Sequence, residues 1–221
     1  MTQGELTIVL LAGGLATRLP GKLLLDVAGE TMLARAYRRL TATGWPCVVS
    51  IRRAIASQVR TALADRAPIE FALDEVEDGG PLEGLRSALR LVRTRLAFAA
   101  AADIPNLSAE FAQRLLSAHD EAPEPKPAAI LPTWPDGKVE PLAALYDAGA
   151  VMRGAEAALR AGRRKVTAAL DGLGVLAYPV TPSESDVLKN INTPDEYAAY
   201  GRMNSTATSA DTGRINSTAT R

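Results

Sequence analysis

The chain has 221 residues, 47% hydrophobic and 23% charged, a balance typical of one globular domain with a full core. Lysine plus arginine and aspartate plus glutamate number 25 each, and this zero net charge argues against a nucleic-acid-binding protein, which would be basic. The single cysteine, Cys47, excludes an internal disulfide, and we expect a cytoplasmic protein. Neither a signal peptide nor a membrane-spanning stretch is expected, because the apolar run at residues 8–11 is too short for either.

The first predicted strand, residues 8–11, is apolar throughout, as in a buried strand of a parallel sheet. It runs into the small residues 12–14, where backbone N–H groups can approach an anion. Arg18 and Lys22 follow, and two cations at this point can close over the same anion. The stretch predicts a triphosphate site at the carboxyl end of the strand. The alternative is a tight strand-to-helix turn with a solvated arginine and lysine.

Two common phosphate-binding loops do not fit this stretch. The dinucleotide fingerprint G-x-G-x-x-G is absent, because Leu15, Ala16 and Thr17 follow the paired glycines. The P-loop pattern also fails, since Ala16 replaces its first glycine and Leu23 replaces the hydroxyl residue that would bind Mg²⁺. A different kind of nucleotide site is therefore expected.

Strand and helix patterns alternate through residue 107, which predicts a single Rossmann-like, doubly wound, mostly parallel α/β sheet with helices on both faces. Further strands are expected at residues 47–51, 69–73, 96–102, 128–131, 141–146 and 175–180. Helices are expected to begin near residues 32, 55, 81, 108, 150 and 194. Cys47 is expected in the core, and His119 on a surface helix away from the chemistry. The domain is predicted to span residues 1–202, and the small polar residues of 203–221 to form a disordered tail.

Two of the predicted strands run directly into an aspartate. Asp74 follows residues 69–73, and Asp103 follows residues 96–102. Because ligands bind at the carboxyl ends of parallel strands, both acids are expected to share a crevice with the glycine loop. One hard carboxylate oxygen with phosphate oxygens is a usual arrangement for Mg²⁺, so Asp103 is the predicted metal ligand. A helix-capping role for Asp103, and an acidic-loop role for Asp74, remain as alternatives.

Five motifs occur in order along roughly residues 5–200. They are Leu11-Ala-Gly-Gly with Arg18 and Lys22, Asp74 with Gly80-Pro-Leu-Glu-Gly, Ala102-Asp-Ile-Pro, Glu140-Pro-Leu, and Asn190-Ile-Asn-Thr-Pro. Together they resemble the signature of nucleotidyltransferases that attach a nucleoside monophosphate to a phosphorylated small molecule. Within that superfamily the likeness is greatest to the molybdenum cofactor guanylyltransferases.

The resemblance implies a Mg²⁺-dependent transfer of GMP from GTP to molybdopterin, with release of pyrophosphate. It implies catalytic roles for Arg18, Lys22 and Asp103, nucleotide contacts at Leu11, Ala12, Gly13, Gly14, Lys22, Ser50, Asp74, Gly80 and Asp103, and acceptor contacts at Arg163, Arg164, Asn190 and Asn192. Solvated arginines and turn-forming asparagines are the alternative for the acceptor set. Glu140 is interpreted as structural or acceptor-facing.

Two departures from the family pattern leave the base and the acceptor open. The loop between Gly14 and Lys22 is shorter than is typical. Ser50 stands where an asparagine usually helps to read guanine, and a hydroxyl has fewer hydrogen-bonding options than an amide. A cytidylyltransferase or a sugar-phosphate nucleotidyltransferase is therefore the second hypothesis, and a non-catalytic nucleotide- or cofactor-binding module is the third.

Overall fold

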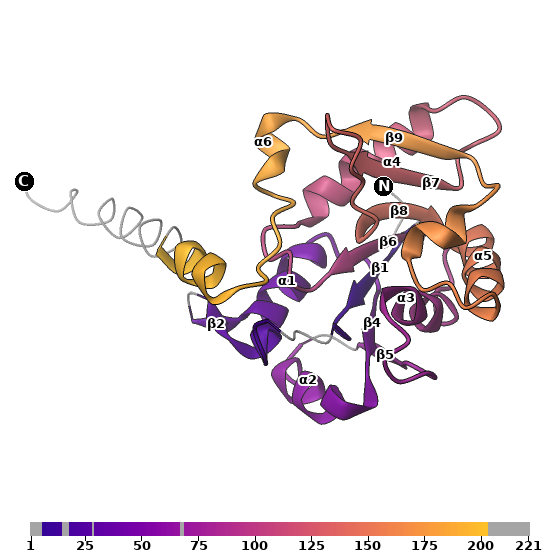
Figure 1. Cartoon of the computed structure of the whole chain (residues 1–221). Helices are drawn as coiled ribbons and strands as arrows, with labels where there is room; N and C mark the ends of the chain where they lie inside the picture. Colours follow the sequence, from indigo (N-terminus) through magenta and orange to yellow (C-terminus); the bar gives the residue numbers. More distant parts are fainter. Residues whose placement is uncertain (1–5, 15–17, 28, 67–68, 203–221) are drawn as a thin grey trace, which may run out of the picture.

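The computed structural model describes residues 6–14, 18–27, 29–66 and 69–202. Seven strands form one sheet in the order β5-β4-β1-β6-β8-β7-β9 (Figure 1). The strands are β1 (Leu6–Leu11), β4 (Cys47–Ile51), β5 (Glu70–Leu73), β6 (Leu96–Ala101), β7 (Ala129–Thr133), β8 (Ala143–Asp147) and β9 (Val175–Pro179). A two-stranded hairpin, β2 (Asp26–Val27) with β3 (Glu30–Thr31), lies apart from this sheet and was not predicted.

Helices cover both faces of the sheet, as the alternating pattern predicted (Figure 1). They are α1 (Met32–Leu40), α2 (Ala56–Ala62), α3 (Pro81–Leu89), α4 (Ala109–Glu121) and α5 (Ala148–Arg160). The short α6 (Pro182–Ser185) and a helix at residues 194–202, where one was predicted to begin, follow in the carboxyl-terminal part. Strand β1 shows why the core has two halves. Ile8 and Leu10 pack with α1 and α4, whereas Val9 and Leu11 pack with α3 and α5. Successive strand residues point to opposite faces, so an all-apolar strand fits a sheet covered on both sides.

Parallel pairing aligns the carboxyl ends of strands β1, β4, β5 and β6. Leu11 lies opposite Ser50 of β4 and Ala101 of β6, and Ile51 lies opposite Leu73 of β5. The residues that follow these strands therefore meet at one edge of the sheet. This register places the functional site.

The sheet is mostly parallel, as predicted, but β8 runs antiparallel to both β6 and β7. The loop between β7 and β8 explains this direction. It turns back at Gly137, whose φ of 82° is in the left-handed region, and the N–H of Gly137 donates to the carbonyl of Trp134 at 2.8 Å. A short turn of this kind joins antiparallel neighbours, whereas parallel ones need a long crossover.

Two single-residue predictions had different outcomes. Cys47 is buried in the core, as expected. His119 lies near the end of α4, the helix expected there, but its side chain faces the protein interior, with 5% of its surface exposed. The predicted tail, residues 203–221, lies outside the described residues. In the described ranges, no helix has both the length and the apolar character that crossing a bilayer requires.

Candidate active site

A cavity of about 240 Å³ opens at the carboxyl edge of β1, β4, β5 and β6. Nine residues predicted from the sequence line it: Leu11, Gly13, Gly14, Lys22, Ser50, Asp74, Gly80, Asp103 and Asn190. Strand ends, the first turn after the glycine loop and the start of α3 contribute these residues. The expectation that the glycine loop and Asp103 share one pocket is confirmed.

Lys22 is the centre of one end of the cavity. It begins a short 3-10 helix, η1 (Lys22–Leu24), and is only 7% exposed. Its ammonium is paired with the Asp103 Oδ2 atom. It also donates to the Asn192 Oδ1 atom at 3.0 Å and to the carbonyl of Ile191 at 3.3 Å. A buried ammonium is stable only with such partners, so three distant segments are tied together here.

Asp103 keeps one carboxylate oxygen for a ligand. While Oδ2 binds Lys22, the Oδ1 atom is buried and has no hydrogen-bond partner among the described residues. A buried unpaired carboxylate oxygen is costly, and a cation is the partner that best offsets this cost. In the described part of the chain no group of three His, Cys, Asp or Glu side chains could hold a metal by itself. One carboxylate with phosphate oxygens and waters is the set that Mg²⁺ uses, so these residues fit Mg²⁺.

Ser50 and Asp74 form the opposite end of the cavity. The Ser50 hydroxyl donates to the Asp74 Oδ1 atom at 3.0 Å, and Asp74 is 5% exposed. Burial raises the pKa of Asp74 to about 6, although the Ser50 hydrogen bond opposes this shift. Two glycines allow this close packing. A Cβ atom on Gly84 would lie 2.8 Å from the Ser50 hydroxyl, and one on Gly13 would lie 3.3 Å from the Asp74 Oδ2 atom.

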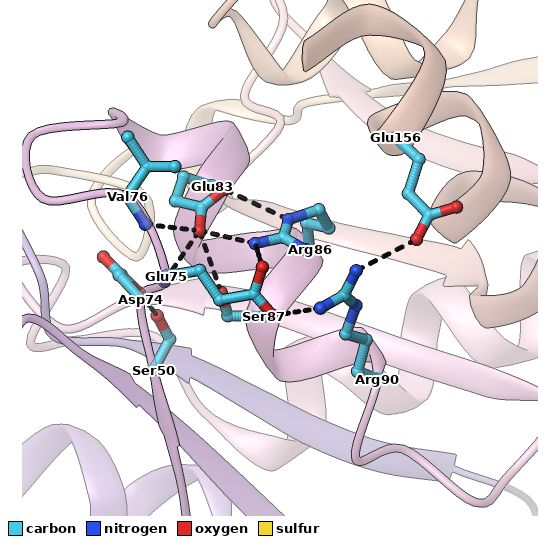
Figure 2. A network of polar contacts seen from close by, with 9 residues as sticks. All are labelled: Ser50, Asp74, Glu75, Val76, Glu83, Arg86, Ser87, Arg90 and Glu156. Carbon is cyan, nitrogen blue, oxygen red and sulfur yellow. Dashed lines mark hydrogen bonds and ion pairs between the residues drawn. The ribbon is translucent and has the colours of Figure 1, made fainter. Parts of the chain in front are cut away.

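A buried ion pair behind Asp74 fixes the loop that follows it (Figure 2). Glu83 of α3 accepts the backbone N–H of Glu75 at 2.9 Å and of Val76 at 3.1 Å. It also binds Arg86 at 2.6 and 3.1 Å. Burial would raise the pKa of Glu83, but Arg86 and the backbone N–H groups hold the pKa below its usual value. Glu83 was quoted within a motif but given no role, so this support was missed from the sequence.

Arg52 is a second residue that the sequence reasoning missed. It lines the cavity beside Gly14 and Asp78, and its side chain is 13% exposed. It follows β4 directly, at the same edge of the sheet as Asp74. The sequence did hold a signal for Arg52, because it directly follows the predicted strand at residues 47–51, two positions after Ser50.

Other predicted residues lie outside the lining of the cavity, as far as the described residues define it. They are Ala12, Arg18, Arg163, Arg164 and Asn192. The N–H of Ala12 donates to the carbonyl of Ser50 at 2.9 Å, so the backbone role predicted for residues 12–14 falls to the two glycines. Arg163 pairs with Asp171 at the surface.

Two of these residues nevertheless lie near the site. Arg164 donates to the carbonyl of Asp78 at 3.0 Å, at the rim of the cavity. Arg18 is exposed. The pKa of Glu196 is lowered, mainly by the N–H of Asn192, and Arg18 adds to this effect. Burial raises the pKa of Glu140, and the negative charge of the nearby Asp103 contributes.

A glycine loop, a paired lysine and a carboxylate with a free oxygen, all at the carboxyl edge of an α/β sheet, define a site for a nucleotide polyphosphate and a cation. Comparison with known proteins gives the family. Residues 8–173 match the family model described as the MobA-like NTP transferase domain. The chain belongs to this family of nucleotidyltransferases.

Individual relatives agree with this assignment. The chain is 34% identical, over 174 residues, to a probable molybdenum cofactor guanylyltransferase of Natronomonas pharaonis. The aligned region covers 77% of this chain and 82% of that protein. It is 30% identical, over 192 residues, to a molybdenum cofactor guanylyltransferase of Pseudomonas syringae, at 85% and 89% coverage. The crystal structure of molybdopterin-guanine dinucleotide biosynthesis protein A from Archaeoglobus fulgidus matches with a TM-score of 0.74 at 25% identity, covering 90% of this chain and 99% of that chain.

Proposed function

We propose that this protein transfers GMP from GTP to molybdopterin and releases pyrophosphate, with Mg²⁺ bound at Asp103. The observation that carries the proposal is the cluster of Lys22, Asp103 and the glycine loop in one cavity. The names of the relatives supply the two substrates. We place the reaction in the cytoplasm because it consumes a nucleoside triphosphate.

In this proposal the chain's own groups align the reactants and balance charge. The backbone N–H groups of Gly13 and Gly14 hold the triphosphate, and Lys22 neutralises the charge that develops at the α-phosphate. Asp103 would hold Mg²⁺, which would supply Lewis-acid stabilisation of the phosphate oxygens, and Asn190 would contact the acceptor. Arg18, on the exposed segment before Lys22, adds positive charge over the leaving pyrophosphate.

The base selectivity is proposed from Asp74. Above pH 6 this buried carboxylate is an acceptor only, and guanine presents N1–H and N2–H donors side by side. Cytosine offers a single amino group on its pairing edge, so it satisfies this carboxylate less well. This favours GTP over CTP, although Ser50 replaces the amide that usually assists.

We assign the acceptor to the side of the cavity between the Gly80 loop and the segment at residues 190–192. Arg164 lies at the rim beside Asp78, and Asn192 holds Lys22, so both can orient the acceptor's phosphate against the α-phosphate. Arg163, paired with Asp171, would have to leave that partner to take part.

One assay separates the candidate functions. The protein is incubated with molybdopterin, Mg²⁺, pyrophosphatase and either GTP or CTP, and phosphate release is measured with and without acceptor. Acceptor-dependent release with GTP is expected. Release with CTP alone would replace the guanylyl assignment by a cytidylyl one. Nucleotide binding without turnover on any acceptor would indicate a non-catalytic binding module.

A further inference from the structure

Arg52 is a cavity-lining cation to which the proposed reaction has so far given no role. It stands where the chain leaves β4, between the glycine loop and the loop that carries Asp78. The Arg52 Nη2 atom is 3.5 Å from the carbonyl oxygen of Gly14, and the Nη1 atom donates to the Asp78 Oδ1 atom at 3.1 Å. The guanidinium therefore spans the cavity wall from the glycine loop to the acidic loop.

The guanidinium is incompletely satisfied by the residues around it. The Arg52 Nε atom is buried and has no partner within the described residues, although only 13% of the side chain is exposed. The contact with the Gly14 carbonyl is long for a hydrogen bond. The guanidinium carries five N–H donors in a fixed fork, and among the described residues its one short hydrogen bond is to Asp78.

That partner is weakly held. The Asp78 side chain is 60% exposed, and ion pairs with an exposed partner contribute little to stability. Glu77 lies at the margin, with its Oε1 atom 4.0 Å from the Arg52 Nη1 atom. A phosphate carries more charge than a carboxylate and fits the guanidinium fork bidentately, so it can displace Asp78.

We propose that Arg52 binds a phosphate group of the nucleotide, and that Asp78 occupies its guanidinium until the nucleotide arrives. This inference rests on the proposed function, because it requires a nucleoside triphosphate in the cavity. It also makes Asp78 an internal competitor of the nucleotide.

Nucleotide affinity measured by calorimetry, in the presence of Mg²⁺, tests the arginine. R52Q is expected to raise the Kd of GTP about tenfold and to leave the Kd of guanosine within twofold, since only GTP carries phosphates. The matched control is R53Q, which removes the same charge from the exposed neighbouring residue and is expected to leave both Kd values unchanged. Equal effects of R52Q on GTP and guanosine, or none on GTP, would overturn the inference.

The acidic partner gives an independent readout. D78N keeps a side chain that tolerates the φ of 58° at this position while removing the competing charge. It is expected to lower the Kd of GTP about threefold, and this gain is expected to shrink when R52Q is also present. A gain that persists in full beside R52Q would show that Asp78 acts without Arg52 and would contradict the competition.

Two measurements keep the outcomes distinct. A wild-type protein that binds neither GTP nor CTP would refute the proposed function itself, whereas normal GTP binding by R52Q refutes only the role of Arg52. If thermal unfolding shows that R52Q does not fold, R52K replaces it, with R53K as control. Lysine keeps the charge but lacks the fork, so a severalfold loss for GTP and none for guanosine is expected.

Discussion

The two ends of the cavity, one at Ser50 and Asp74 and the other at Lys22 and Asp103, differ in packing and in charge. At the base end, Asp74 is packed between Gly13 and Gly84 and accepts from Ser50, and the loop behind it is fixed by Glu83. At the proposed phosphate end, Asp103 keeps a buried oxygen without a partner in the described part of the chain, and Lys22 joins its own segment to Asp103 and to residues 191–192. The first end is shaped by close packing, whereas the second presents a charged oxygen that the described residues leave without a partner. Shape suits the recognition of a base, and unsatisfied charge suits a metal and a polyphosphate.

The largest expected effect comes from removing the incomplete carboxylate. Asp103→Ala is expected to lower turnover by about 10³-fold, because the cation loses its protein ligand. The measurement is acceptor-dependent pyrophosphate release at saturating GTP. Because this variant leaves the buried Lys22 ammonium without its counter-charge, it should also lose about 3 kcal/mol of unfolding free energy, so turnover is compared only for protein that circular dichroism shows to be folded. Unchanged activity in this variant would remove Asp103 from the metal site.

Lys22 should matter next. Lys22→Ala is expected to lower turnover by about 10²-fold, the usual scale for one preorganised electrostatic contact. The same pyrophosphate assay reports it, with Lys126→Ala as the charge-matched control, because Lys126 lies outside the cavity lining and donates to the carbonyls of Asp120 and Ala122 at the end of α4. A wild-type rate for Lys22→Ala would exclude this lysine from the chemistry.

The buried ion pair between Glu83 and Arg86, which fixes the loop after Asp74, can be removed separately. Glu83→Gln leaves the Arg86 guanidinium, whose side chain is 7% exposed, with only the exposed Glu75 carboxylate at 3.0 Å as counter-charge, and is expected to cost about 3 kcal/mol of unfolding free energy. Urea denaturation measures this loss. Glu75→Gln is the matched control, because Glu75 is 57% exposed and should cost less than about 1 kcal/mol. Equal costs for the two variants would show that burial of the Glu83 pair does not matter.

The smallest expected effect is a pH dependence at the base end. Burial raises the pKa of Asp74 from 3.8 to about 6, so the carboxylate that we propose as acceptor for the guanine donors is lost as the pH falls through 6. The Kd of guanosine, which has no phosphate to titrate, is expected to rise as the pH falls from 7.5 to 5. Asp74→Asn should bind guanosine weakly at every pH. A pH-independent Kd in the wild type would contradict this role.

The raised pKa of Asp74 also makes the unfolding free energy depend on pH. The folded protein holds the Asp74 proton more tightly than the unfolded chain does, because the folded pKa is raised. Asp74 therefore lowers the unfolding free energy progressively as the pH rises from about 4 through 6. Asp74→Asn should lack this component of the pH dependence in urea denaturation. Burial of the Asp74 carboxylate thus lowers the unfolding free energy at neutral pH, while it keeps an acceptor in the cavity for a ligand.

Sequence patterns located this site well where it depends on strand ends. Ile8–Leu11 and residues 96–101 are apolar runs that end in marked residues, and the topology of a parallel sheet brings such ends together. The antiparallel direction of β8 was not predicted, because the sequence shows a strand but not its neighbour. Arg52 and Glu83 were missed for a similar reason. Their roles come from contacts with loops distant in sequence, and neither residue differs by type from an ordinary surface charge.

The most direct test of the account is a structure of the protein with GTP and Mn²⁺ in place of Mg²⁺, located by its anomalous scattering. The account predicts the metal on the Oδ1 atom of Asp103, with the triphosphate between it and the two glycines. A metal or triphosphate bound away from Asp103 and Lys22 would contradict it.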